Sequence, residues 1–365
     1  EDEALNLARV LAARGEGVIQ ALVETGPMNR ENRIFVEKLA EVSGRPVLHT
    51  VVSIDELDPS QHRSILNWLD DCASRGLQVY SQALCFRFMP MPFVVKDFDG
   101  WQQIPIFNEF QHPGNGDTVD ARVAKAQDPD YRDRLAAIKD VPSFGNVKRM
   151  VLVDAAGSGR FEKYVGKTFE EIGKAENIRP TDVFLDLCAE TRLTCEVCPE
   201  RFVPNIEFAT EINAHPKVLP GTSDGGAHPK FWSGGQYGSD LIAWLVREQK
   251  KISLEHMHHK LSSVPAQALG WADRGEIVEG KCADIFIYHF ETLGVATSAY
   301  ETVTDLPGKE WRRIARPKGI LGIVVNGKIT FRNDQCSGCT PGQFVTLKPG
   351  RDGMVGGSVE LPARV

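Results

Sequence analysis

The most informative stretch of this chain is Leu219-Pro220-Gly221-Thr222-Ser223-Asp224-Gly225-Gly226-Ala227-His228. The residues that lead into it, 217–219, are predicted to form a short apolar strand, so Asp224 follows the carboxyl end of that strand. The glycines allow a sharp turn and leave room for a ligand. In parallel α/β folds the chemistry gathers at such strand ends. Asp224 and His228 therefore suit a metal or proton-transfer site, whereas the plainer alternative is an Asx-type turn with a capping aspartate.

The composition is that of an ordinary globular protein. Of its 365 residues, 25% are charged and 42% are hydrophobic, and the net charge is −7. The absence of a basic block argues against a nucleic-acid partner, and no apolar run approaches the ~20 residues of a membrane span. The acidic start, Glu1-Asp2-Glu3, leads into a predicted helix, so we expect no signal peptide. We expect a cytoplasmic protein that acts on a small molecule.

Eight cysteines in a chain of this length indicate a reducing compartment with thiols rather than a disulfide framework. Two CxxC pairs occur, Cys195–Cys198 and Cys336–Cys339. Together they could hold one zinc ion through four thiolates, and either pair could be redox-active. Neither pair is flanked by a zinc-ribbon pattern, so isolated thiols in loops are the favoured interpretation.

Strands and helices alternate over the first 84 residues. Continuous apolar runs predict buried strands, and apolar residues at helical spacing predict amphipathic helices between them. The predicted strands are 18–23, 46–52 and 77–84, and the predicted helices are 3–14, 29–42 and 58–76. A repeat of about 30 residues is typical of parallel βα units.

The alternation stops from Cys85 to Val141. This segment contains several aromatic residues, the run His112-Pro113-Gly114 and a charged helical patch. A long insertion at a strand end is often functional. Two interpretations stay open, namely a lid that turns its aromatic side chains to a substrate, and a small separate core beneath a long loop.

The sequence pattern changes from helical to strand-like beyond Trp271. Residues 276–288 predict a turn followed by an alternating strand, and 320–331 predict a β-hairpin with Asn326-Gly327 at its tip. The last part of the chain is therefore predicted to be a small region of short β-strands.

Taken in order, these features resemble the amidohydrolase superfamily, in particular its N-acyl-D-amino-acid deacylase (D-aminoacylase)-like branch. The matching segments are Thr222-Ser223-Asp224-Gly225-Gly226-Ala227-His228, the helix from Leu254 into Leu261-Ser262-Ser263-Val264-Pro265-Ala266, Asp273-Arg274-Gly275-Glu276-Ile277-Val278-Glu279-Gly280-Lys281-Cys282-Ala283-Asp284-Ile285, Asp305-Leu306-Pro307, and Val324-Val325-Asn326-Gly327. The resemblance implies an α/β fold, a (β/α)8 TIM-type barrel that lacks its N-terminal part and is followed by a small C-terminal β-sandwich. It assigns 1–270 to the barrel, with 85–141 as insertion or lid, and 271–365 to the sandwich.

One part of the family pattern is absent from this chain. The family has a first barrel strand that ends in His-x-His and supplies two metal ligands, and no such strand occurs here. The histidines of His256-x-His258-His259 lie within a predicted helix, where a solvated face is favoured over a metal site. An incomplete barrel would expose the edges of a buried sheet. We therefore expect a missing N-terminal segment or a companion chain that carries His-x-His.

The resemblance also implies a mechanism. Zinc lowers the pKa of a bound water to roughly 7, and a base takes the proton of that water and passes it to the leaving amine. Asp224 is the implied general base and a candidate metal ligand. His228 is the second catalytic candidate, through orientation of Asp224 or through a hydrogen bond to the substrate, with a role in loop packing as its alternative. The further candidate ligands are His49, with a hydrogen-bonded histidine in the sheet as its alternative, and Glu24, with a helix cap as its alternative. One zinc ion is expected rather than two.

Three residues are candidates for substrate binding. Arg87 could clamp a carboxylate, or it could be a surface arginine paired with nearby acids. Lys230 and Trp232 follow the Asp224 turn closely. The predicted function is hydrolysis of a C–N bond in an N-acyl amino acid or a similar small amide, by a protein that is expected to be a homo-oligomer. The alternatives are hydrolysis of a cyclic amide or another C–N bond, and a non-catalytic structural or regulatory barrel subunit.

Overall fold

The first three strand–helix units form a parallel sheet, as the sequence predicts. In the computed structural model, β1 (Ile19–Ala21), β2 (Val47–Val52), β3 (Val79–Ala83) and β7 (Val218–Leu219) pair in the order β1-β2-β3-β7. All three pairings are parallel. The structure describes residues 1–23, 30–54, 58, 60–85, 87, 91–102, 104–114, 116–138, 145–199, 204–295, 300–333 and 335–345.

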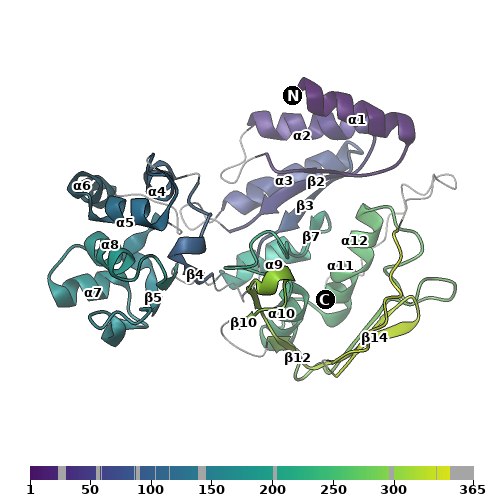
Figure 1. Ribbon diagram of the computed structural model, residues 1–365. Helices are drawn as coiled ribbons and strands as arrows, with labels where there is room; N and C mark the ends of the chain where they lie inside the picture. Colours follow the sequence, from purple (N-terminus) through teal and green to yellow (C-terminus); the bar gives the residue numbers. More distant parts are fainter. Residues whose placement is uncertain are drawn as a thin grey trace.

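Three helices accompany these strands, namely α1 (Asp2–Arg14), α2 (Arg30–Ser43) and α3 (Gln61–Ser74). Figure 1 shows α1 and α2 side by side above the sheet. Leu39 of α2 and Trp68 and Leu69 of α3 are buried in the same core as Val47 and Val79 of the strands. Burial of this apolar layer drives the helices onto one face of the sheet.

The other face of the sheet carries a different set of side chains. Leu48, Tyr80 and Leu219 form a second apolar cluster with α12 (Ser263–Ala268). Nearer the carboxyl ends of the strands, the amide of Gln82 accepts hydrogen bonds from Gln20 Nε2 at 2.8 Å and from Thr50 Oγ1 at 2.6 Å. Because side chains alternate along a strand, neighbouring residues reach opposite layers of the molecule.

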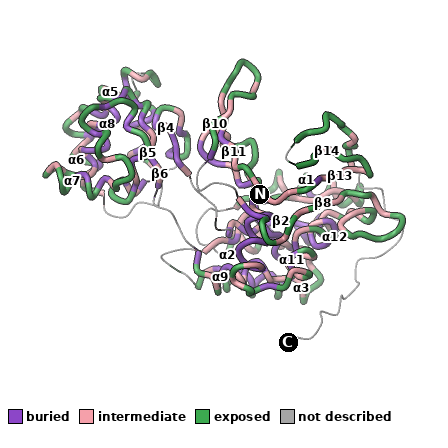
Figure 2. Tube along the Cα trace, turned by 90° about the horizontal axis from the view of Figure 1, so that it is seen from below, coloured by how far each residue is buried: buried purple, intermediate pink, exposed green. Residues whose placement is uncertain are grey.

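A lobe interrupts the sheet between β3 and β7. An antiparallel sheet in the order β4-β6-β5 lies at its base. Its elements are β4 (Phe93–Val94), η1 (Val95–Asp97), α4 (Pro105–Gln111), α5 (Val119–Gln127), α6 (Pro129–Ala137), η3 (Val147–Arg149), β5 (Val151–Asp154), η4 (Glu162–Tyr164), α7 (Phe169–Glu176), α8 (Pro180–Glu190) and β6 (Glu196–Cys198). Figure 2 shows this lobe as a body with a buried interior, to one side of the rest of the chain.

Aromatic side chains fill the interior of the lobe. Trp101 stacks on Phe107 with ring centroids 4.7 Å apart, and Phe110 and Phe184 pack against it edge-on. All four are fully buried. The aromatic residues of the predicted 85–141 insertion thus face one another, as in the second of the two interpretations, and not a substrate. Their core is continuous with that of the parallel sheet and includes residues well beyond 141.

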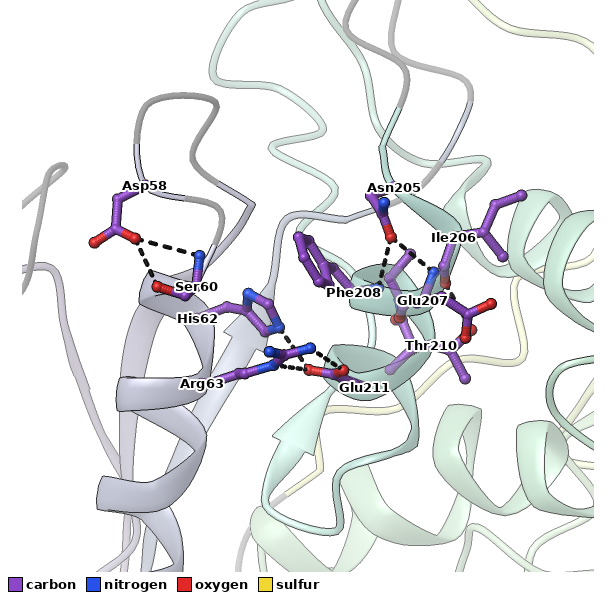
Figure 3. Close-up of polar contacts among 12 residues, drawn as sticks. Asp58, Ser60, His62, Arg63, Asn205, Ile206, Glu207, Phe208, Thr210 and Glu211 are labelled. Carbon is purple, nitrogen blue, oxygen red and sulfur yellow. Dashed lines mark hydrogen bonds and ion pairs between the residues drawn. The ribbon is translucent and has the colours of Figure 1, made fainter.

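The chain returns to the sheet through α9 (Ile206–Ala214). Asn205 caps this helix by accepting hydrogen bonds from the backbone N–H groups of Glu207 and Phe208. Glu211 of α9 binds α3, because its carboxylate accepts from Arg63 at 2.7 and 2.8 Å and lies 2.8 Å from His62 Nε2 (Figure 3). This cluster ties the helix before β7 to the helix before β3.

Helices follow the turn that comes after β7. They are α10 (Tyr237–Leu241), the π-helix η5 (Ile242–Glu248), α11 (Leu254–Leu261) and α12. Among the described residues, none of the helices is both long and apolar enough to cross a membrane.

The region beyond Trp271 is made of short antiparallel strands. Its main sheet has the order β15-β14-β13-β8, and two-stranded sheets pair β10 with β11 and β12 with β9. The strands are β8 (Ile285–Tyr288), β9 (Gly294–Val295), β10 (Glu301–Val303), β11 (Arg312–Ile314), β12 (Pro317–Lys318), β13 (Ile320–Val325), β14 (Lys328–Arg332) and β15 (Gln335–Cys336), and η6 (Pro307–Lys309) lies between β10 and β11. Asn326 and Gly327 both have positive φ, which confirms the predicted tight hairpin between β13 and β14.

Candidate functional site

The Asp224 turn begins where β7 ends. Asp224 is exposed and has φ +43°, a left-handed conformation that aspartate tolerates better than most residues. Its carbonyl oxygen accepts a hydrogen bond from the Ala227 N–H at 3.0 Å. The prediction that this acid follows the carboxyl end of a parallel strand is therefore confirmed.

Glycines close the turn on itself. The N–H of Gly234 donates to the carbonyl oxygen of Ser223 at 2.7 Å. A Cβ atom at Gly234 would lie 2.8 Å from the carbonyl oxygen of Thr222 and 2.9 Å from that of Ser223, so a larger residue would push the two ends of the loop apart. The segment from Thr222 to Gly234 is thus a closed loop with Asp224 near one end.

His228 turns toward the lobe. Its ring packs against Phe231 with centroids 4.7 Å apart, and its Nδ1 lies 4.0 Å from Asp99 Oδ1. Phe231 in turn meets Phe98 of the lobe edge-on at 4.9 Å. These contacts place His228 between the turn and the lobe, and the predicted orientation of Asp224 by His228 is not among them.

Lys230 and Trp232 differ in exposure. The Lys230 ammonium is one-third exposed, bonds Asp97 Oδ1 at 3.4 Å and Glu310 Oε2 at 3.1 Å, and lies over the ring of Trp311. Burial lowers its pKa, but the pairs with Glu310 and Asp97 outweigh burial and raise the pKa overall. Trp232 is buried in the main core. Lys230 is therefore the more accessible of the two predicted substrate contacts.

Arg87 is bound by two acids. Its backbone N–H donates to Asp240 Oδ2 at 2.7 Å, its guanidinium reaches Asp240 Oδ1 at 3.4 Å, and it also pairs with Glu248. Asp240 is 1% exposed, so this pair ties the end of β3 to α10 and η5. The predicted clamp on a substrate carboxylate is not supported by this placement. The alternative of an arginine paired with nearby acids describes it, because the guanidinium donors already face carboxylates.

His49 lies on the face of the sheet that α3 covers. Its Nδ1 hydrogen-bonds Ser81 Oγ at 2.9 Å, and its ring meets Trp68 of α3 edge-on. Burial, with a smaller effect of the charge on Arg33, lowers its pKa to about 4. These contacts do not support a metal ligand, and they match the alternative of a hydrogen-bonded histidine in the sheet. The other candidate ligand, Glu24, lies outside the described residues.

The described residues contain no cluster of three or more histidine, cysteine, aspartate or glutamate side chains that could hold a metal ion. No disulfide bond joins the cysteines of the described residues. Cys198 lies in β6 and Cys336 in β15 rather than in loops, and the interpretation of the two CxxC pairs stays a prediction. In the helical histidine set, His258 hydrogen-bonds Tyr288 at 2.7 Å.

Sequence reasoning missed the residues that surround the turn. Asp97 and Asp99 come from the lobe, and Tyr300, Glu310 and Arg313 come from the C-terminal β region. Each is far from Asp224 in sequence and belongs to no motif, so no local pattern could have identified it.

Comparisons with known proteins agree with the predicted family. No protein-family model matches the chain. An N-acyl-D-aspartate deacylase of Alcaligenes xylosoxydans xylosoxydans is 27% identical over 179 residues, which are 46% of this chain and 33% of that protein. An N-acyl-D-glutamate deacylase of the same organism is 28% identical over 109 residues, 30% of this chain and 20% of that protein. The matched part is thus about a third or less of these relatives.

Solved structures show the fold. A D-aminoacylase with a binuclear metal centre has a TM-score of 0.53 at 17% identity and covers 93% of this chain and 57% of its own. The N-acyl-D-glutamate deacylase of Bordetella bronchiseptica, solved with zinc and a phosphonate inhibitor, has a TM-score of 0.51 at 16% identity and covers 90% of this chain and 56% of its own. The chain has a mixed α/β fold of the kind that these structures have. Together with the two curated relatives, they confirm the predicted resemblance to the D-aminoacylase-like branch.

Proposed function

We propose that this chain, which resembles the D-aminoacylase branch of the amidohydrolases, forms part of a hydrolase that cleaves the C–N bond of an N-acyl amino acid or a similar small amide. The main observation behind this proposal is the exposed Asp224 carboxylate, which lies in a closed turn after a parallel strand. The curated relatives named above are N-acyl-D-aspartate and N-acyl-D-glutamate deacylases, which supports this substrate class.

The proposal extends to the architecture. The sheet β1-β2-β3-β7 would be part of a (β/α)8 barrel, with 1–270 as the barrel portion and 271–365 as a β-sandwich. β1 and β7 are the edge strands of the described sheet, and each would pair with further strands of a preceding segment or of a companion chain. Assembly into a homo-oligomer and a cytoplasmic location belong to the same proposal.

Asp224 would move the proton. Its carboxylate would accept a proton from the attacking water and pass it to the nitrogen of the leaving amine, which is the work of a general base and then of a general acid. Its exposure keeps it within reach of a small molecule. Lys230 would bind the substrate carboxylate, and that carboxylate would replace Asp97 or Glu310 beside the ammonium.

The predicted zinc ion needs ligands beyond those that the structure describes. Asp224 is one carboxylate, His49 faces the helices, and the described residues assemble no group of three possible ligands. The donor set of the described residues does not fit a metal ion, so the proposed mechanism contains only the proton transfer at Asp224 and the binding of substrate.

The test is the hydrolysis of a substrate panel by the wild type and by Asp224→Asn. We expect release of free amino acid from N-acetyl-D-amino acids, and a fall in kcat of about 10²–10⁴-fold in the variant with an unchanged circular dichroism spectrum. Asp130→Asn, which changes an exposed acid of the lobe, is the matched control. Ring opening of a cyclic amide in place of deacylation would favour the alternative function, hydrolysis of a cyclic amide. Absence of any Asp224-dependent hydrolysis, with and without added Zn²⁺, would favour the non-catalytic subunit.

A further inference from the structure

Arg313 in β11 and Tyr300 just before β10 hydrogen-bond the second half of the Asp224 loop, residues 229–233. The backbone N–H of Arg313 donates to the carbonyl oxygen of Pro229 at 2.7 Å, and Arg313 Nε donates to that of Lys230 at 2.8 Å. The Tyr300 hydroxyl donates to the carbonyl oxygen of Ser233 at 3.1 Å and accepts from the N–H of the same residue at 3.3 Å. The backbone from 229 to 233 is thus fixed at both of its ends by one hairpin.

Arg313 is buried although it is charged. It is 6% exposed, its Nη2 lies 3.0 Å from Glu196 Oε1 of the lobe, and its guanidinium lies over the ring of Trp311. Burial of a guanidinium costs free energy unless its donors are bonded. Here the donors are divided between Lys230 and Glu196, so the residue joins the loop, the lobe and the hairpin at one point.

The neighbouring arginine has a different setting. Arg312 is about 40% exposed and makes a bidentate pair with Asp305, with both distances 2.7 Å. The two arginines are adjacent in β11 and therefore project to opposite sides of the strand. Arg312 offers a matched control, because it has the same side chain in the same strand and bonds Asp305 instead of the loop.

Lys230 is held by both its backbone and its side chain. Arg313 fixes its carbonyl oxygen, while Glu310 and Asp97 hold its ammonium. The first end of the loop is closed by the bond from Gly234 to Ser223. Rotation of the Arg313 side chain would free the Lys230 carbonyl and let the segment between Asp224 and Ser233 change its course.

We propose that Arg313 is a positioning residue for the Asp224 loop, because its backbone and guanidinium hold the carbonyl oxygens of Pro229 and Lys230, with Tyr300 in the same role at Ser233. Its effect on catalysis rests on the proposed function, whereas its effect on the loop does not. A misplacement of about 1 Å at a reacting group costs about 10²-fold in rate.

The experiment compares amide hydrogen exchange and kinetics in the full chain for the wild type, Arg313→Met, Tyr300→Phe and Arg312→Met. We expect peptides within 222–234 to exchange about 10-fold faster in Arg313→Met, with peptides of β2 and α3 unchanged. Deacylation should show a kcat about 10²-fold lower with KM within a factor of about three, because the loop still forms but samples misaligned positions. Arg312→Met should match the wild type in both measurements.

Tyr300→Phe keeps the proposal testable if Arg313→Met fails to fold, because it removes only a hydroxyl group. It should also speed exchange in 222–234, by a smaller factor than Arg313→Met. Unchanged exchange in this segment in both variants would overturn the proposal, and so would an equal rise across the whole molecule. A wild type without Asp224-dependent deacylation would refute the proposed function, while faster exchange confined to 222–234 would still support the positioning role.

Discussion

The ammonium of Lys260 in α11 donates a hydrogen bond to the carbonyl oxygen of Val218 in β7, the strand that leads into the Asp224 turn. It also donates to the carbonyl oxygen of His215. Lys260 is 1% exposed, and burial lowers its pKa to about 7. A buried amine thus satisfies backbone acceptors at the start of the last parallel strand.

This burial predicts an unusual pH dependence of stability. The folded state holds the Lys260 proton only below about pH 7, whereas the unfolded chain holds it to about pH 10.4, so the unfolded state binds more protons between these values. The unfolding free energy of the wild type relative to Lys260→Met should therefore rise from pH 7 to 9.5, by at most about 1.4 kcal/mol per pH unit. Urea titrations at several pH values measure it. Lys251→Met, at an exposed ion pair, is the control, and a flat difference for Lys260→Met would contradict the prediction.

His49→Phe separates a structural histidine from a metal ligand. The phenyl ring keeps the contact with Trp68 but loses the bond to Ser81, so the unfolding free energy at pH 8 should fall by about 1 kcal/mol. The folded pKa lies below the unfolded value, so His49 destabilises the wild type as pH falls from about 6.5 to 4, and the variant should lose less stability over that range. Zinc content, measured by atomic emission, should not change. Loss of bound zinc without loss of stability would restore His49 as a ligand.

Arg87→Met tests whether this arginine stabilises the fold or binds the substrate. The change removes charge-assisted hydrogen bonds to Asp240 and Glu248, so the unfolding free energy should fall by about 1.5–3 kcal/mol. KM for an N-acyl amino acid should stay within about twofold of the wild type. Thermal unfolding and initial-rate kinetics are the measurements, with Arg312→Met as an exposed control. A large rise in KM with unchanged stability would favour the carboxylate clamp instead.

Lys230→Met tests the substrate contact that remains. If its ammonium binds the substrate carboxylate, KM for an N-acyl amino acid should rise about 10-fold, while KM for the matching methyl ester stays unchanged. Lys230→Arg should recover most of the affinity because the positive charge is kept. Equal rises for acid and ester would show that the residue acts only through its pairs with Asp97 and Glu310.

Much of the fold followed from local patterns. The runs at 18–23, 46–52 and 77–84 predicted the parallel strands, because continuous apolar segments separated by helical periodicity leave few other arrangements. The long segment after β3 was harder to interpret. Its aromatic residues could equally face a substrate or one another, and only the packing of Trp101 on Phe107 shows that they form a core.

The candidate site also contains features that no local sequence pattern predicts. The orientation of His49 was not predictable, since Val47 and Leu48 are both apolar and nothing local marks which face of the strand the helices cover. Arg87 and Asp240 are 153 positions apart, and Arg313 lies 83 positions from Lys230. No spacing rule connects residues that meet only after the chain has folded.

Local sequence patterns were enough to predict the parallel βα units, the Asn326-Gly327 hairpin and the place of Asp224 after a strand. These depend on periodicity and turn chemistry within a few residues. The packed fold was needed to see that His49 faces α3, that Arg87 pairs with two acids and that Arg313 bonds the Asp224 loop. The reason is physical, because charged and polar groups are paired by whichever distant elements the burial of apolar surface brings beside them.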